Sequence, residues 1–336
     1  MYTLNHLILE IIRKAYGKVY GSKNRISYSE ELSTSPDEAS DLIFKLLMSE
    51  KPCMVARFGA NELGMVCNYL SIISNHHSVI KFIKGEEAEW WWNRRQMQAM
   101  QNNAGFFPAD EEHLARFCQL MLKDAKYVDV LGRWIKDEEK VIDLSAIKSV
   151  RLLYLEPYHS SRPWSRALEG KRVLVVHPFA ELIEAQYKNH REHLFENKDV
   201  LPPFELTTIP AVQSLGGEDN GFNDWFEALQ WMKDEIDKQD YDVAIIGCGA
   251  YGFHLAAHVK RRGKKAVHLG GALQLLFGIK GKRWENPLYG GTTLGATGRY
   301  PALFNEYWVY PDERFKPTNA NQVEGGCYWG TAPSKE

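Results

Sequence analysis

The sequence predicts an α/β protein built on a parallel sheet that carries helices on both faces. From residue 151 onward, short apolar runs alternate with amphipathic stretches, which is the pattern of successive strand–helix–strand units. A glycine-rich stretch at 247–252 follows one apolar run and precedes a helical pattern. Nearer the start, the apolar run 53–56 ends at Arg-Phe-Gly and a helical pattern follows. Together these observations predict a Rossmann-like fold.

The composition excludes several classes of protein. With 336 residues, of which 44% are hydrophobic and 25% charged, the chain is typical of a globular protein with a substantial core. Its 41 basic and 43 acidic residues nearly cancel, so we expect no nucleic-acid partner. No apolar run is long enough to span a bilayer. Five scattered cysteines without a Cys-x-x-Cys pair indicate reduced thiols and a cytoplasmic location.

Residues 1–50 are predicted to form an N-terminal helical segment. The apolar residues of its first helix share one face, which we expect to dock on the protein's own core. The alternative is a peripheral contact between this helix and the inner face of a membrane. That face consists of Leu4, Leu7, Ile8, Ile11, Ile12, Ala15 and Val19. A polar stretch at 21–34 leads to a second helix, whose start is marked by a capping box of Ser35 and Glu38 around Pro36.

Residues 51–283 are predicted to form the main Rossmann-like domain. The strands are expected at 53–56, 126–132, 151–156, 171–179, 204–211, 241–247 and 264–270. The helices are expected from about Asn61, and at 86–103, 110–124, 180–195, 222–239, 250–263 and 271–279. Because ligands of such sheets bind beyond the carboxyl ends of the strands, the residues that follow each strand are the candidates for a binding site.

Residues 284–336 differ from the rest of the chain. They are rich in glycine, proline and aromatic residues and show no periodicity. We interpret them as a lid or wrapping segment rather than a separate domain. Their aromatic residues suit stacking on the faces of sugars, and they equally suit fixing the tail to the body; Trp308, Tyr310 and Trp329 are the candidates.

The corner that follows the first strand carries three polar candidates. Arg57 at the end of the strand can reach a diphosphate, and Asn61 can cap the next helix while it faces a ligand. Gly59 lies between them. Glu62 falls in the first turn of that helix, where a carboxylate can bind a divalent cation, hold a sugar hydroxyl or complement the helix dipole.

The glycine-rich stretch predicts a phosphate site. Gly247, Gly249 and Gly252, with Ala250 and Tyr251 between them, permit a tight turn ahead of a helix N-terminus. A dinucleotide site needs a carboxylate at the end of the next strand, but that strand, "KKAVHLG", ends without one. We therefore expect no NAD, and an oxidoreductase remains the less favoured reading.

Other candidates come from the loops around the strand at 171–179. His177 follows that strand and can contact a phosphate or act as a base, and Glu181 in the next helix is another candidate base. Ahead of the strand, Arg162 and Trp164 lie in a loop that we expect to meet donor or acceptor. The histidine pairs His254/His258 and His190/His193 have metal-ligand spacing but no third ligand nearby, so we expect solvated or core histidines there.

Two blocks of the sequence are similar to a known family. "ARFGANEL" near the start and "VAIIGCGAYGFHLAAHVKRRGKKAVHLGGAL" near the end resemble, in the same order, the GT-D-fold bacterial glycosyltransferases, whose first strand is followed by Arg-Phe-Gly-Asp-Gly-Glu. The resemblance extends over roughly residues 50–285 as an architecture. It assigns Arg57 and Glu62 to the Arg and Glu of the family motif, whereas the Asp position is occupied by Ala60 and the Gly position by Asn61.

The resemblance implies a glycosyltransferase that moves a sugar from a nucleotide-activated donor to a glycan, polysaccharide or glycoprotein acceptor. It also implies Mn²⁺ or Mg²⁺ near Glu62, but Ala60 removes one of the carboxylates that the family uses. The charge on the leaving diphosphate can instead be met by Arg57 and helix N-termini. The alternative is a non-catalytic protein of the same fold that binds nucleotides or glycans.

Overall fold

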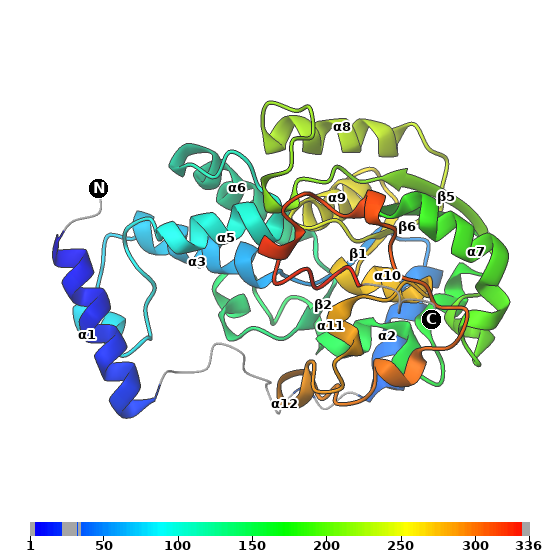
Figure 1. The fold of residues 1–336 in the computed structure, drawn as a ribbon, viewed down its shortest axis with the longest axis horizontal. Helices are drawn as coiled ribbons and strands as arrows, with labels where there is room; N and C mark the ends of the chain where they lie inside the picture. The colour runs from blue at the N-terminus through cyan, green and yellow to red at the C-terminus, as the bar shows by residue number, and fades with distance from the viewer. Residues whose placement is uncertain (1–3, 22–31, 33–34, 331–336) are drawn as a thin grey trace.

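The computed structural model describes residues 4–21, 32 and 35–330 of the chain. A seven-stranded sheet forms the centre, and every neighbouring pair of its strands is parallel (Figure 1). The strand order is β3-β2-β1-β7-β6-β4-β5. The strands are β1 (Cys53–Ala56), β2 (Val130–Arg133), β3 (Lys148–Arg151), β4 (Arg172–His177), β5 (Glu205–Pro210), β6 (Val243–Ile246) and β7 (Lys265–His268). The predicted α/β fold with a parallel sheet is confirmed.

Helices cover both faces of the sheet. Alternate residues of each strand point to opposite sides, so both faces are apolar and each needs a covering layer. In β1, Met54 and Ala56 pack into one apolar cluster, whereas Cys53 and Val55 pack into the other. The first cluster is completed by α3 (Ala60–Ile73), α5 (Arg94–Ala104), α6 (Glu111–Asp124), α8 (Trp225–Asp237) and α9 (Tyr251–Arg261). The second is completed by α2 (Pro36–Met48), α7 (Ala180–Leu194), α10 (Leu273–Leu276) and part of the tail.

The order of the strands fixes where a ligand site is expected. From β1 the chain moves outward to β2 and β3, and it then crosses to the other half of the sheet to form β4 and β5. The last two strands, β6 and β7, fill the gap between β4 and β1. In doubly wound sheets, the crevice at such a reversal lies beyond the carboxyl ends of the strands and is the usual binding site.

Two predicted elements are wrong. Residues 86–93 were expected to begin a helix, but α5 starts only at Arg94, because the Asn93 side chain caps it by accepting from the backbone N–H groups of Arg95 and Gln96. Residues 152–155 form a 3₁₀ turn rather than the predicted strand, and the strand β3 precedes them. A short apolar run alone does not distinguish a strand from a buried turn.

The first helix, α1 (Leu4–Tyr20), contradicts the expectation that its apolar face docks on the core. Leu7, Ile8, Ile11 and Ile12 of that face are 42–57% exposed. The helix instead packs through its other side against the short helix α4 (Val79–Ile83). Leu4, Ala15 and Val19, the other residues of the predicted apolar face, belong to the same helix. Most of the predicted linker at 21–34 lies outside the described residues.

The second helix starts as predicted. The Glu38 backbone N–H donates to the Ser35 hydroxyl at 3.2 Å, and the Ser35 backbone N–H donates to the Glu38 carboxylate at 3.0 Å. Among the described residues, no helix has both the length and the apolar character needed to cross a bilayer.

The tail beyond residue 283 wraps over the carboxyl edge of the sheet (Figure 1). It contains the short helices α11 (Lys282–Glu285) and α12 (Gly291–Leu294) and several 3₁₀ turns. The buried Trp308 fixes it to the body, because its indole N–H donates to the carbonyl of Leu194 at the end of α7. The Tyr310 hydroxyl is bonded to the Glu285 carboxylate. Neither Trp308 nor Tyr310 lines the cavity at the carboxyl edge of the sheet.

Candidate functional site

A cavity of about 700 Å³ lies at the carboxyl edge of the sheet, where the two halves of the sheet meet. Residues just beyond the ends of four different strands line it. Arg57 follows β1, Pro178 follows β4, Gly247 follows β6 and Gly270 follows β7. The corner at 57–62 and the first half of the glycine-rich stretch, residues 247–249, therefore line the same cavity.

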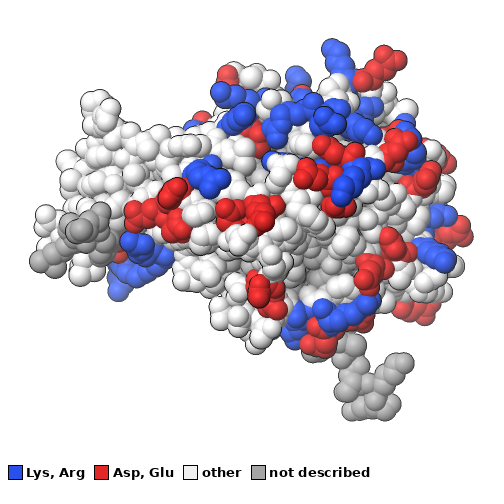
Figure 2. Space-filling model, turned by 90° about the horizontal axis from the view of Figure 1, so that it is seen from above, with Lys and Arg blue, Asp and Glu red and all other residues white. Residues whose placement is uncertain are grey.

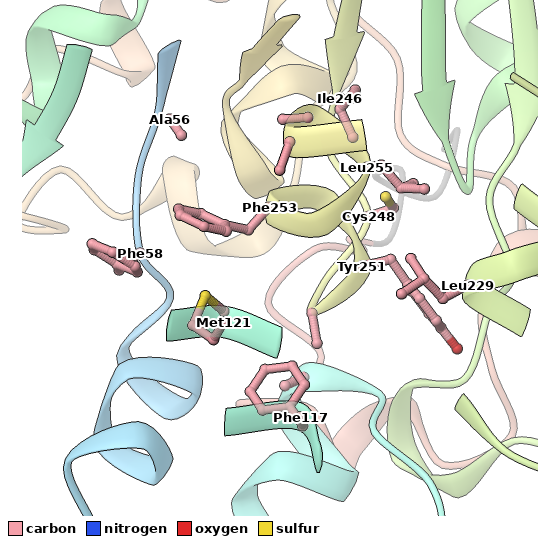
Figure 3. Packing of buried hydrophobic residues seen from close by; sticks show 14 of the residues in the cluster. Ala56, Phe58, Phe117, Met121, Leu229, Ile246, Cys248, Tyr251, Phe253 and Leu255 are labelled. Atoms are coloured by element: carbon pink, nitrogen blue, oxygen red, sulfur yellow. The ribbon is translucent and has the colours of Figure 1, made fainter. Parts of the chain in front are cut away.

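The β1 corner is held in place by its phenylalanine. Phe58 is fully buried, and its ring stacks on Phe253 of α9 with 4.9 Å between the ring centroids (Figure 3). This contact joins the first corner of the site to the helix that follows the glycine turn. The neighbouring Arg57 stays half-buried at the cavity wall and forms no ion pair with a described residue.

Glu62 folds back over the start of its own helix. A Cβ atom added to Gly59 would lie only 1.9 Å from the Glu62 Oε2 atom, so the carboxylate occupies the space next to that glycine. Burial raises the pKa of Glu62, while its own backbone N–H and the charge of Arg57 oppose the shift. A carboxylate with a raised pKa beside a cavity is suited to accept a proton.

The glycine turn reaches the cavity with its first half only. Gly247, Cys248 and Gly249 line the cavity, whereas Ala250 and Tyr251 are buried in the core. Gly249 has a φ of +53°, which favours glycine. Within the described part of the chain, the backbone N–H groups of Cys248 and Gly249 have no acceptor, so both are free to donate to an anion.

The last glycine of the motif has a packing role. A Cβ atom at Gly252 would approach the Nε2 atom of His268 to 2.5 Å, so only glycine lets α9 lie this close to β7. Tyr251 stacks on Trp225, with 5.0 Å between the ring centroids, and its hydroxyl is 3.1 Å from the hydroxyl of Ser214. These contacts place Ala250, Tyr251 and Gly252 behind the site rather than in its lining.

His177 presents a hydrogen-bond donor to the cavity. Its Nδ1 accepts the backbone N–H of Phe179 at 3.0 Å, so in the neutral ring the proton resides on Nε2. Burial lowers the pKa of His177 to about 3, which keeps the ring neutral. In this tautomer His177 donates rather than accepts, and it would have to give up the Phe179 contact to act as a base through Nε2.

Three buried polar atoms in the lining lack a hydrogen-bond partner among the described residues. They are Asn103 Oδ1, His268 Nδ1 and Gln274 Oε1. Both His268 and Gln274 are at least 96% buried. Burial and the charge of Arg57 lower the pKa of His268 to about 3, so this ring is also neutral. Buried polar atoms are nearly always paired in proteins, so these three are exceptions among the residues that line the cavity.

Three long helices begin without a side-chain cap, and the N-cap residues of two of them, Gly59 of α3 and Phe179 of α7, line the cavity. The N-cap residues of α3, α7 and α9 make no side-chain hydrogen bond to the helix. By contrast, α2, α5, α6 and α8 are capped by the side chains of Ser35, Asn93, Asp110 and Asp224, none of which lines the cavity. Uncapped N-termini leave backbone donors and a partial positive charge available for an anion.

The tail closes the remaining side of the cavity through residues 324–329. Arg283 of α11 holds this segment. Its guanidinium is bonded to the Glu324 carboxylate and, at 2.8 Å, to Cys327 Sγ. It also lies 4.7 Å from the centroid of the Tyr328 ring. Glu324 has a φ of +48°, and the two glycines after it are also left-handed, which produces a tight turn at the cavity wall. Lys282, beside Arg283, also lines the cavity and forms no ion pair with a described residue.

Several predicted site residues lie elsewhere. Glu181 is exposed on α7 and pairs with Arg314 at 2.7 Å. Arg162 forms an ion pair with Asp41 of α2 at 2.7 Å. Trp164 is fully buried, and its indole N–H donates to the Leu155 carbonyl. These three residues have structural partners away from the lining, so they are not candidates for ligand contact.

The structure adds residues that the sequence analysis missed. Trp134 follows β2 at the same edge of the sheet, and its indole N–H donates to the Phe58 carbonyl at 2.9 Å. The available signal for Trp134 was its position two residues beyond the predicted strand 126–132. His268 fell inside the predicted strand 264–270 and is the last residue of β7, and Gln274 and Arg283 do not follow a strand either, so none of the three carried this signal. The paired histidines are structural as expected, since His254 contacts Asp124 and His258 contacts Asp237, each at 2.9 Å.

The side chains of the lining do not fit a metal held by the protein alone. No group of three His, Cys, Asp or Glu side chains among the described residues is arranged to hold an ion. The lining contains two carboxylates, Glu62 and Glu324, and the second is already bonded to Arg283. Ala60 occupies the position where the resemblance implied an aspartate.

No protein-family model, curated protein or solved structure matches this chain. The geometry of the cavity therefore carries the functional argument.

Proposed function

We propose that the protein is a glycosyltransferase that binds a nucleotide-activated sugar in the cavity at the carboxyl edge of the sheet. The observation that carries the proposal is the convergence of the Arg57–Glu62 corner and the Gly247–Gly249 turn on one cavity. Arg57, Lys282 and the free backbone N–H groups of the turn supply positive charge and donors for a diphosphate. The resemblance to GT-D-fold glycosyltransferases supports the same reading.

In the reaction we propose, Glu62 accepts the proton of the acceptor hydroxyl. The hydroxyl oxygen forms a bond to the anomeric carbon, while the bond from that carbon to the diphosphate oxygen breaks. The electron pair of the broken bond leaves with the nucleoside diphosphate, whose added charge is met by Arg57 and the helix N-termini. His177, with its proton on Nε2, donates a hydrogen bond to the sugar or the phosphate. No step is assigned to a metal.

The five cysteines are all free in the structure. We therefore expect the protein to act in a reducing compartment such as the cytoplasm.

Thermal unfolding tests the proposal first. The protein is measured against a panel of nucleoside diphosphates and nucleotide sugars, with and without Mn²⁺. We expect one member to stabilise the fold, by about 2.7 kcal/mol at a hundredfold excess over its Kd. No stabilisation by any member, with or without the ion, would overturn the proposal.

A second measurement separates catalysis from binding. Release of the nucleoside diphosphate from the stabilising nucleotide sugar is followed for the wild type, for Glu62→Gln and for Glu181→Gln as the exposed control. We expect turnover to be lost in Glu62→Gln, to persist in Glu181→Gln, and nucleotide stabilisation to persist in both. Stabilisation without turnover in the wild type would instead establish the non-catalytic binding protein.

A further inference from the structure

The exposed apolar side chains of this protein gather at one end of the molecule. Of the twelve large hydrophobic residues that are exposed in the described part of the chain, nine lie on α1, on α4 or at the end of α3. These nine are Leu7, Ile8, Ile11, Ile12, Val19, Tyr20, Ile73, Val79 and Ile80. Soluble monomers rarely expose apolar patches of this kind unless they bind something there.

This end of the molecule lies away from the sheet and from the cavity. In Figure 1, α1 occupies one extremity of the longest axis, while the strands lie toward the other. At the same extremity, Figure 2 shows a broad surface without charged residues, whereas charges are dense over the remainder of the view. The patch is therefore separate from the proposed nucleotide site.

The contacts of α1 explain why its apolar stripe faces outward. His6 stacks on Trp91 with 4.1 Å between the ring centroids and 10° between the ring planes. The Arg13 guanidinium lies 4.6 Å from the Phe82 ring centroid and 3.3 Å from the Glu89 carboxylate. These residues occupy the side of α1 opposite to Ile8 and Ile11, because residues of one helical face recur every three or four positions. Polar and aromatic contacts thus fix the helix with its most apolar face exposed.

Unpaired lysines border the patch. Lys14 and Lys18 on α1 and Lys81 and Lys84 at α4 are exposed, and none forms an ion pair with a described residue. The nearby acidic side chains have partners. Glu87 lies 3.7 Å from His77, Glu89 pairs with Arg13, and Glu10 and Glu86 also make interactions. Four exposed lysines without an ion-pair partner among the described residues therefore stand beside the apolar surface.

We propose that α1, α4 and the end of α3 form a docking surface for an anionic lipid bilayer. The apolar stripe would enter the boundary between headgroups and acyl chains, and the four lysines would contact anionic headgroups. A second copy of the chain fits less well, because an isologous interface sets the same surface against itself and brings the two sets of lysines together. A bilayer complements both the apolar area and the charge.

Sedimentation with vesicles tests this surface. The full chain is mixed with large unilamellar vesicles of phosphatidylcholine alone or of equal parts phosphatidylcholine and phosphatidylglycerol. We expect binding to the anionic vesicles that weakens as salt is added, and little binding to the neutral ones. The double variant Ile8→Glu/Ile12→Glu should lose at least about a hundredfold in affinity, since each isoleucine contributes roughly tenfold or more when it is buried. Lys14→Gln and Lys18→Gln should each lose about fivefold.

The control is Leu288→Glu, which introduces the same charge at a 73% exposed apolar residue outside the patch. It should bind vesicles as the wild type does, and all variants should keep the thermal midpoint of the wild type because the substituted side chains are exposed. Equal loss in Leu288→Glu and in the α1 variant would overturn the proposal. Absence of vesicle binding in the wild type would also overturn the proposal. This holds for a monomeric protein and equally for one that forms, in sedimentation equilibrium, a dimer that the α1 variant abolishes.

Discussion

The guanidinium of Arg57 lies 4.9 Å from the centroid of the Trp134 ring. The two residues follow neighbouring strands, β1 and β2, and the Trp134 indole N–H is bonded to the carbonyl of Phe58, which is next to Arg57. The ring therefore supports the cation from one side, and Arg57 lines the cavity. Because a guanidinium held in this way loses little freedom when it binds an anion, Trp134 preorganises the proposed diphosphate site.

Replacement of Trp134 should weaken ligand binding without unfolding the protein. We expect Trp134→Ala to reduce affinity for the stabilising nucleotide about fivefold, which corresponds to roughly 1 kcal/mol of lost cation–π interaction. Trp134→Phe keeps a ring but removes the indole donor, so it should retain most of that affinity. Isothermal titration of both variants measures the difference. Equal affinity in the wild type and Trp134→Ala would contradict the role of the ring.

Gly59→Ala should separate folding from activity. The three atoms nearest to the added Cβ atom all belong to the flexible end of the Glu62 side chain, and the φ of −77° at this position is accessible to alanine. We expect the free energy of unfolding to change by less than about 1 kcal/mol, while turnover falls to the level of Glu62→Gln because the carboxylate is displaced. Chemical denaturation and turnover are measured on the same preparations. Full activity in Gly59→Ala would show that the position of the Glu62 carboxylate is not critical.

Ala60→Asp should create a response to Mn²⁺. Ala60 is exposed in the cavity lining, one position into α3, so an aspartate there fits without repacking and complements the helix dipole. A second carboxylate beside Glu62 supplies the oxygen ligands that such an ion prefers. We expect Mn²⁺, together with the nucleotide, to raise the thermal midpoint of Ala60→Asp more than that of the neutral control Ala60→Asn. Identical shifts in the two variants would refute a metal site at this corner.

The neutral histidine His177 should make stability depend on pH. Its folded-state pKa is depressed from 6.5 to about 3, so the unfolded chain binds more protons between these values. Its contribution is therefore fully present above pH 6.5 and is lost as the pH falls toward 3, at up to about 1.4 kcal/mol per pH unit. In His177→Asn the amide oxygen can still accept the Phe179 N–H, but nothing titrates. We expect a shallower decline of unfolding free energy between pH 6 and 4 in urea titrations of this variant. The same decline in both proteins would disprove the assignment.

The sequence could predict the sheet and half of the site because both follow from local pattern. Arg57 was found because an apolar run ends directly before it, and Glu62 because it falls in the first turn of the next predicted helix. Gly247 and Gly249 were found because glycines follow a strand. Arg162 and Trp164 were misjudged because a loop that leads into a parallel strand gives no indication of its carboxyl edge. Trp164 instead fills the core, where its indole N–H has a backbone partner.

Other features depend on contacts between distant parts of the chain. The 324–329 segment reaches the cavity through Arg283, and no periodicity in the tail indicates this. The stripe on α1 was recognised but was expected to dock on the core, because the pattern Leu7–Ile8–Ile11–Ile12 defines a face and not what covers it. Only the packing of His6 and Arg13 on the other side settles its direction.

The wall built from residues 324–329 also has a consequence for biosynthesis. All four strand ends of the cavity precede residue 271, but the wall opposite them is contributed by the final stretch of the described chain. During translation, a polypeptide still tethered to the ribosome at that stretch can fold its sheet while the cavity stays open on one side. A closed binding chamber then exists only in chains that have been synthesised past Tyr328, and chains cut short before it would lack the enclosure.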